Sequence, residues 1–361
     1  MLRNTPQWLP SYVAGRFRRR GAPGLVHVMF CFVDHFEPDW GGAGLAQQVA
    51  RVERWARDYP AMAARHADAD GRPPQHTFFY PAEVYESEVL ERVARLCRAG
   101  YGEIEVHLHH CDDTTQSLRQ KLEQAKACFS RHGALAKDKR TGAPRFGFIH
   151  GNWTLDNAGS DGKECGVNDE LRLLRDVGCY ADFTLPSAPS ETQTRKINSI
   201  YYATDDPARP KSHDTGDDVR VGCPPRGDLM IIQGPLTLNW RRRKYGVLPR
   251  IENGDVSASH PPSPMRTDLW VRERIGVRWR EEWVFVKVHT HGAKEDNAAV
   301  VLGRETDAMY ADLETRYNDG TRFRLHYVTA RELYNIVKAA EAGESGDPGQ
   351  YRDYLLMRGT T

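Results

Sequence analysis

Three short apolar segments of this chain each end in histidine or carboxylate side chains, and this feature restricts the possible fold most strongly. The segments are 28–37, 105–110 and 284–291, and the histidines and carboxylates toward their ends are Asp34, His35, Glu37, His107, His109, His110, His289 and His291. Residues two apart in a strand point the same way, about 6.5–7 Å apart, so His107 and His109 could contact one cation. The pattern predicts one polar site at the carboxyl edge of a sheet and indicates a metal-dependent enzyme.

Strand-like and helical patterns alternate along the chain. Strands are expected at 26–33, 76–80, 103–109, 145–150, 181–184, 229–233, 283–289 and 323–327, and helices at 44–64, 86–98, 115–132, 168–177, 268–275, 304–317 and 330–342. Roughly seven or eight such units are typical of parallel strands with crossover helices. We therefore expect a single α/β domain over 1–361, a distorted (β/α)7–8 barrel. A Rossmann-type open sheet is the alternative, but no GxGxxG turn follows the first strand.

The segment 187–270 departs from this alternation. It is rich in Pro, Asp and Arg, and it is expected to form long, irregular loops over the site, with the strand at 229–233 within it. Just before it, Asn168 is expected to cap the helix that ends before Gly178.

Composition excludes several classes of protein. Lys and Arg total 50 against 49 Asp and Glu, which argues against nucleic-acid binding. No apolar run approaches the roughly 20 residues that a membrane span needs. The 7 cysteines show no CxxC spacing, so a disulfide framework or a Cys-rich zinc site is not expected. A cytoplasmic protein with reduced thiols is predicted, and the oligomeric state stays open.

The histidines suggest which metal and which roles to expect. Neutral imidazole suits Zn²⁺ above all, and also Ni²⁺, Co²⁺ or Fe²⁺; two histidines plus a carboxylate leave positions open for water. The candidate ligands are Asp34, His35, His107, His109 and His110. His289 and His291 are further ligands, or one of them is the proton donor, since histidine titrates near neutral pH.

Other segments suggest how a substrate is bound. His150, Asn152 and Trp153 follow the 145–150 strand and predict a tight loop with an aromatic surface for a sugar ring and an amide for a hydroxyl. Asp182 is a strand carboxylate that either supports the site or serves structure. The aromatic segment 76–83 is interpreted as a pocket wall.

The ordered motifs resemble those of the polysaccharide deacetylases with a NodB homology domain, within the glycoside hydrolase/deacetylase barrel superfamily. Phe32-Val-Asp-His35 is similar to the family's Thr-Phe-Asp-Asp, Glu103-Ile-Glu-Val-His107 to its Glu-Ile-x-x-His, and Val288-His289-Thr-His291 to its Leu-His. The resemblance covers roughly 25–185 and 280–340. It implies that Asp34 is a base, that His107 binds metal and that His289 is the acid.

The chain also departs from these motifs. Cys111 stands where the family has its second metal-binding histidine, and His35 where it has a metal-binding aspartate. The 150–153 segment takes the place of an Arg-Pro-x-Gly loop without its arginine, and Asp182 that of an aspartate that orients the arginine.

From the histidine pattern we expect a metal-dependent hydrolase, and the resemblance implies that it removes an acetyl group from a sugar or glycan precursor. The metal would polarise the acetyl carbonyl and lower the pKa of a bound water. Asp34 or Glu37 would accept the water's proton and His289 would protonate the leaving group. One alternative is a glycosidase of the same superfamily, using a carboxylate pair such as Asp34 and Asp182. Another is a non-catalytic barrel that binds a glycan or a partner.

Overall fold

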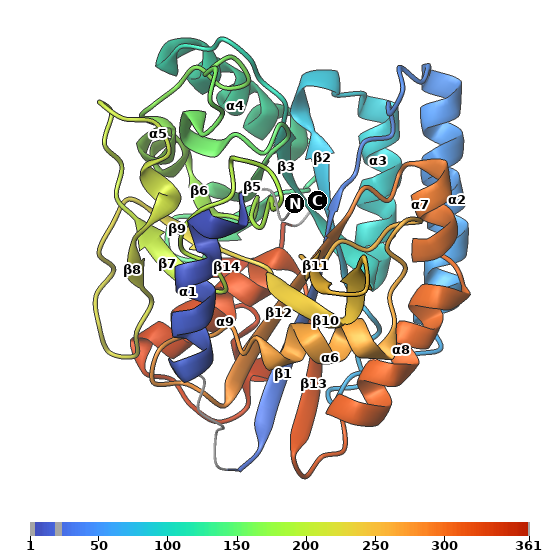
Figure 1. Ribbon diagram of the computed structural model, residues 1–361. Coiled ribbons are helices and arrows are strands. Elements are labelled where there is room, and N and C mark those ends of the chain that lie inside the picture. Colours follow the sequence, from blue (N-terminus) through green and yellow to red (C-terminus); the bar gives the residue numbers. More distant parts are fainter. Residues whose placement is uncertain (1–3, 19–23, 360–361) are drawn as a thin grey trace.

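A computed structural model describes residues 4–18 and 24–359, and a large β-sheet organises them (Figure 1). The strands are β1 (Val26–His35), β2 (His76–Pro81), β3 (Gly102–Leu108), β4 (Ala136–Asp138), β5 (Pro144–His150), β6 (Cys179–Asp182), β7 (Ile200–Ala203), β8 (Asp217–Asp218), β9 (Leu229–Ile232), β10 (Thr237–Lys244), β11 (Leu248–Glu252), β12 (Trp283–Thr290), β13 (Phe323–Val328) and β14 (Leu356–Met357). The α-helices are α1 (Thr5–Arg18), α2 (Leu45–Ala63), α3 (Ser87–Leu96), α4 (Thr115–Ser130), α5 (Glu170–Val177), α6 (Pro264–Arg272), α7 (Glu295–Val301), α8 (Arg304–Tyr317) and α9 (Ala330–Ala342). Short 3₁₀ or π turns lie at Ala82–Val84, Cys97–Tyr101, Leu155–Asn157, Ser212–Asp214 and Pro348–Tyr351.

The sheet is mixed but mostly parallel. Its order is β12-β1-β2-β3-β5-β6-β9-β7-β8, and β13 pairs with β1 as well. The pairs from β12 to β9 are parallel, whereas β7 runs antiparallel to both β9 and β8. The α/β class expected from the sequence is confirmed. Because parallel strands share one carboxyl edge, the ends of β1, β3, β5 and β12 lie on the same side of the sheet.

The two faces of the sheet carry separate cores. Val28, Phe30 and Phe32 of β1 belong to the cluster that also contains the apolar faces of α2, α3, α4, α5 and α8. Met29, Cys31 and Val33 belong to the cluster that contains one face of α9. We call these the outer-helix face and the α9 face. Since side chains alternate along a strand, Asp34 continues the first face and His35 the second.

Helices α8 and α9 have the bounds expected from their patterns, and most other elements differ by one to four residues. Strand β1 is longer than expected and includes Asp34 and His35, because its pairing with β12 continues to Asp34 and that with β2 to His35. The α5 N-cap is Asp169, not Asn168, whose side chain accepts a hydrogen bond from Asn157 instead. The expectation of one strand within 187–270 was wrong. This segment also forms β7, β8 and the β10–β11 hairpin.

These strands escaped detection for physical reasons. Strand β7 has only 4 residues and is buried throughout, so it shows no alternation. Strand β10 ends in the charged run Arg241–Lys244, which is exposed and held by pairing with β11 rather than by burial.

No helix in the described part of the chain is both long and apolar enough to cross a membrane.

Candidate metal centre

Glu37 stands at the centre of the polar residues that follow β1, β3 and β12. Its Oε1 lies 3.3 Å from His107 Nε2 and 3.1 Å from His109 Nε2, and its Oε2 lies 3.1 Å from His291 Nδ1. We call Glu37, His35, His107, His109 and His291 the edge group. Burial alone would raise the pKa of Glu37, but its hydrogen bonds to His107, His109 and His291 lower that pKa well below its usual range.

His35 lies among the rings of this group without a partner for its own Nδ1. Its ring centroid is 4.9 Å from that of His107 and 4.5 Å from that of His291. Its Nδ1 is buried and has no hydrogen-bond partner among the described residues. Burial, followed by the neighbouring His291 and His107, holds the pKa of His35 well below its usual value, so the ring is neutral. A buried neutral imidazole with a free nitrogen suits a metal ion.

His109 is oriented from behind by a second carboxylate, that of Glu83. His109 Nδ1 lies 2.6 Å from Glu83 Oε1, while its Nε2 faces Glu37. Burial would lower the pKa of His109, but the hydrogen bonds to Glu37 and Glu83 raise it to about 10. A carboxylate behind a histidine is the usual support of a metal-binding imidazole. Glu83 belongs to the segment that the sequence pattern marked only as a pocket wall.

The edge group is partly open. The side chains of His109 and His291 are 35% and 28% exposed, whereas His107 is fully buried. Ligand atoms of Glu37, His107 and His109 all lie within 4.8 Å of one another, so these three residues could hold a metal ion. An open arrangement of two imidazoles and a carboxylate leaves room for water or substrate beside the ion.

Two tryptophans border the edge group. The Trp153 ring stacks on that of His35, with centroids 4.8 Å apart, and lies 5.5 Å from that of His289. The ring of Trp40 lies 5.9 Å from that of His291, and Trp40 is 41% exposed. The aromatic surface expected at Trp153 is therefore next to the polar residues, and Trp40 adds to it.

His289 is placed deeper than His291. It is 6% exposed, and its ring centroid is 6.4 Å from that of His35. Burial lowers the pKa of His289 to about 3. Below it on β12, Lys287 is buried, and its Nζ donates to the carbonyl oxygens of Phe183 and Leu185.

Asp34 faces away from the edge group, as its position on the outer-helix face requires. Its Oδ2 lies 2.9 Å from His76 Nε2, and its Oδ1 accepts the backbone N–H of Gly292 at 2.6 Å. Asp34 thus ties β1 to β2 and to the loop after β12. A Cβ added at Gly292 would lie 2.2 Å from Asp34 Oδ2, so the contact requires glycine there.

Asp182 and Asn152 also serve the surrounding structure. Asp182 is fully buried and accepts hydrogen bonds from the backbone N–H and the hydroxyl of Thr184. Asn152 Nδ2 donates to the carbonyl oxygens of His110 and Glu164. Neither side chain contacts the edge group.

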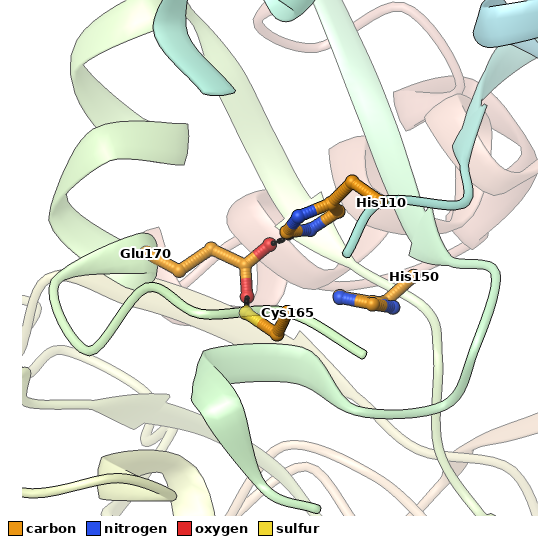
Figure 2. Close-up of side chains that lie close together, drawn as sticks. All are labelled: His110, His150, Cys165 and Glu170. Atoms are coloured by element: carbon orange, nitrogen blue, oxygen red, sulfur yellow. Dashed lines mark hydrogen bonds and ion pairs between the residues drawn. The ribbon is translucent and has the colours of Figure 1, made fainter. Parts of the chain in front are cut away.

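His110 and His150 meet in a different place, on the outer-helix face. They form a buried group with Cys165 and Glu170 that could hold a metal ion, as their potential ligand atoms all lie within 4.8 Å of one another (Figure 2). The expected single site is therefore divided into two groups. Cys165 and Glu170 were missed because neither lies next to a histidine in the sequence; the only signal was their place in the loop after β5 and the start of α5.

No model of a known protein family matches the chain, and no curated protein matches it.

Proposed function

We propose that this protein is a metal-dependent hydrolase that removes an acetyl group from a sugar or glycan precursor, on a distorted barrel of the polysaccharide deacetylase type. The observation that carries the proposal is the position of Glu37 between His107, His109 and His291 at one sheet edge. The likeness of the motifs at 32–35, 103–107 and 288–291 to those of that family supports the choice of reaction.

Glu37, His107 and His109 would hold the ion, and Zn²⁺ suits these nitrogen and oxygen ligands best. His35 offers its free nitrogen beside them, and Glu83 orients His109. A zinc ion bound in such a site polarises a carbonyl group and lowers the pKa of a coordinated water toward 7.

His291 is the group best placed to move a proton. Its Nδ1 faces Glu37 Oε2 at 3.1 Å, and its side chain is 28% exposed. Glu37, whose pKa is held well below its usual range, would orient the His291 ring, and His291 could accept a proton from the attacking water and pass it to the leaving group. Asp34, the other candidate base, has both oxygens engaged by His76 and Gly292, so we assign it a positioning role.

His289 remains a candidate acid, but its environment suits this role less well than that of His291. Its pKa of about 3 makes the ring neutral at pH 7, and the ring is buried next to those of Trp153 and His35. We propose that His291 donates the proton and that His289 shapes the base of the site.

Trp153 and Trp40 would bind the sugar. Aromatic rings offer broad apolar faces, and Trp40 is already partly exposed next to His291. The glycosidase alternative is less well supported, because its carboxylate pair, Asp34 and Asp182, is fully buried and each carboxylate is engaged by protein groups.

Incubation of the Zn²⁺-loaded protein with N-acetylated and O-acetylated oligosaccharides tests this function. We expect acetate to be released without reducing sugar, and His107→Ala to abolish the release. His132→Gln is the matched control, since His132 lies near the end of α4 and contacts Tyr85 and Glu91. Reducing sugar without acetate would favour a glycosidase, and a protein that binds the sugar without either product would be a binding module.

A further inference from the structure

The buried group on the outer-helix face has the chemistry of a second site. His110, His150, Cys165 and Glu170 are at most 2% exposed. His110 Nε2 lies 3.2 Å from Glu170 Oε1, and Cys165 Sγ lies 3.5 Å from Glu170 Oε2. The ring centroids of His110 and His150 are 4.4 Å apart. Figure 2 shows the four side chains directed toward a common centre.

This group is distinct from the edge group, although His109 and His110 are neighbours in the chain. His109 contacts Glu37 on the α9 face, while His110 contacts Glu170 from α5 on the other face. His150 likewise shares the face of Phe148, a member of the outer-helix core. Neither group includes a ligand of the other.

The Glu170 carboxylate lacks a strong cationic partner. It is fully buried, and it accepts the backbone N–H of Asp156 at 2.5 Å. Within residues 4–18 and 24–359, no lysine or arginine forms an ion pair with this carboxylate. Its only ion-pair partner there is His110. A buried carboxylate needs compensating positive charge, which a metal ion would supply.

The surrounding chain holds the ligands in place. Asp113 Oδ2 lies 3.1 Å from His110 Nδ1, without a hydrogen bond between these two atoms, and is fixed by Lys121 and Ser117, so a carboxylate lies next to the histidine ring. The backbone N–H of Asp113 also donates to the carbonyl oxygen of Cys165 at 3.0 Å. A Cβ at Gly166 would lie 2.6 Å from the Asp113 carbonyl oxygen, so the loop and the end of β3 are packed closely.

We propose that His110, His150, Cys165 and Glu170 form a second metal site, a closed four-ligand zinc site with a structural role. Two imidazoles, one thiolate and one carboxylate are ligands that tetrahedral Zn²⁺ accepts, and complete burial leaves no position for substrate. The ion would fasten the loop between β5 and α5, which carries Trp153, to the end of β3. This inference does not depend on the proposed hydrolase activity.

Substitution with Co²⁺ tests the site directly, because Co²⁺ bound to a thiolate shows a sulfur-to-cobalt charge-transfer band and Co²⁺ bound to nitrogen and oxygen alone does not. We expect this band in the Co²⁺-loaded wild-type protein, and we expect it to remain in His107→Ala, which removes an edge ligand. Cys165→Ser should lose the band and one bound ion per chain. Cys111→Ser is the matched control, since Cys111 is exposed and outside the group, and it should keep both.

Wild-type protein that takes up Co²⁺ without the band would overturn the proposal. So would a band that persists in Cys165→Ser or disappears in Cys111→Ser. If Cys165→Ser does not fold, Glu170→Gln replaces it, because this nearly isosteric change should lower Co²⁺ affinity at the buried group by at least tenfold while the band remains at saturating Co²⁺. Unchanged affinity in Glu170→Gln would also contradict the assignment.

Discussion

The indole ring of Trp153 stacks on the imidazole ring of His35, with centroids 4.8 Å apart and planes inclined by 25°. Trp153 adopts a φ of 63°, in the left-handed region, to reach this position from the loop after β5. This conformation costs free energy for a residue with a large side chain, and the stack on His35 is one contact that offsets the cost.

We expect Trp153→Ala to raise KM for an acetylated sugar by roughly three- to tenfold, the worth of one aromatic contact, and to leave the bound ion in place. Trp153→Phe should recover part of the loss. Steady-state kinetics together with metal analysis give both quantities, and Trp279→Ala, at a residue 64% exposed, is the control. An unchanged KM would show that Trp153 does not contribute to sugar binding.

Replacing the carboxylate behind His109 should lower the affinity of the edge group for the metal ion without abolishing binding. Glu83→Gln keeps the size of the side chain but lowers its ability to accept the proton of His109 Nδ1. We expect metal affinity at the edge group to fall by about 10- to 100-fold. Competition with a chromogenic chelator measures it. Glu88→Gln is the control, because Glu88 is an exposed residue of α3. If Glu83→Gln lowers metal affinity no more than Glu88→Gln does, Glu83 does not support His109.

A single methyl group should displace His109. A Cβ at Gly151 would lie 2.3 Å from His109 Cδ2 and 2.7 Å from its Nε2, closer than atoms can approach. Gly151→Ala should therefore turn the ring away from Glu37 and lower metal affinity by at least tenfold with little change in folded structure. Gly44→Ala is the control, because nothing lies within 4 Å of its Cβ. Titration with Zn²⁺ and circular dichroism would separate loss of binding from loss of fold.

The two histidines after β12 should differ in kinetics. His291→Gln should lower kcat by roughly 10²–10⁴, the usual contribution of a positioned acid or base, and should leave the bound ion in place. His289→Gln should change kcat less than His291→Gln. The reverse order would return the acid role to His289, and loss of the ion in His291→Gln would make His291 a ligand.

Asp218 should make stability depend on pH. Burial alone would raise its pKa, but Lys196, Ser199 and Arg278 lower it to about 2 from the ordinary 3.8. A lowered carboxyl pKa adds stability that is complete above the unfolded value and is lost as pH falls through the folded value. Asp218→Asn should thus reduce the free energy of unfolding by about 2 kcal/mol at pH 7.

This difference should shrink between about pH 5 and pH 2, and urea unfolding at several pH values measures it. Asp217→Asn, at the exposed neighbour, should change stability little at any pH. A difference from wild type that stays constant down to pH 2 would show that ionisation of Asp218 is not its source.

The sequence predicted the α/β class and the polar carboxyl edge because both depend on local patterns. The ranges expected for helices α8 and α9 agree with the structure at both ends. The strands at 103–109 and 283–289 were located from their apolar runs, and their terminal histidines do lie at one sheet edge. The short strand β7 and the charged strand β10 depend on pairing partners elsewhere in the chain, which local patterns do not reveal.

The division of the polar residues into two groups follows from alternation along the strands, which the sequence already contains. His107 and His109 have the same parity on β3 and its extension, whereas His110 has the opposite one. His35 and Asp34 differ in the same way. What could not be read from the sequence was that the loop after β5 folds back to bring Cys165 and Glu170 beside His110, since this depends on long-range contacts such as that between Asp113 and Cys165.

The adjacency of His109 and His110 has a thermodynamic consequence. One peptide bond joins a residue of the edge group to a residue of the buried group, and the loop that carries Trp153 also carries Cys165. If an ion in the buried group changes the affinity of the edge group by some factor, an ion in the edge group must change the affinity of the buried group by the same factor. Loading of the buried group would then change the metal concentration at which the edge group fills, and the reverse would hold to the same extent.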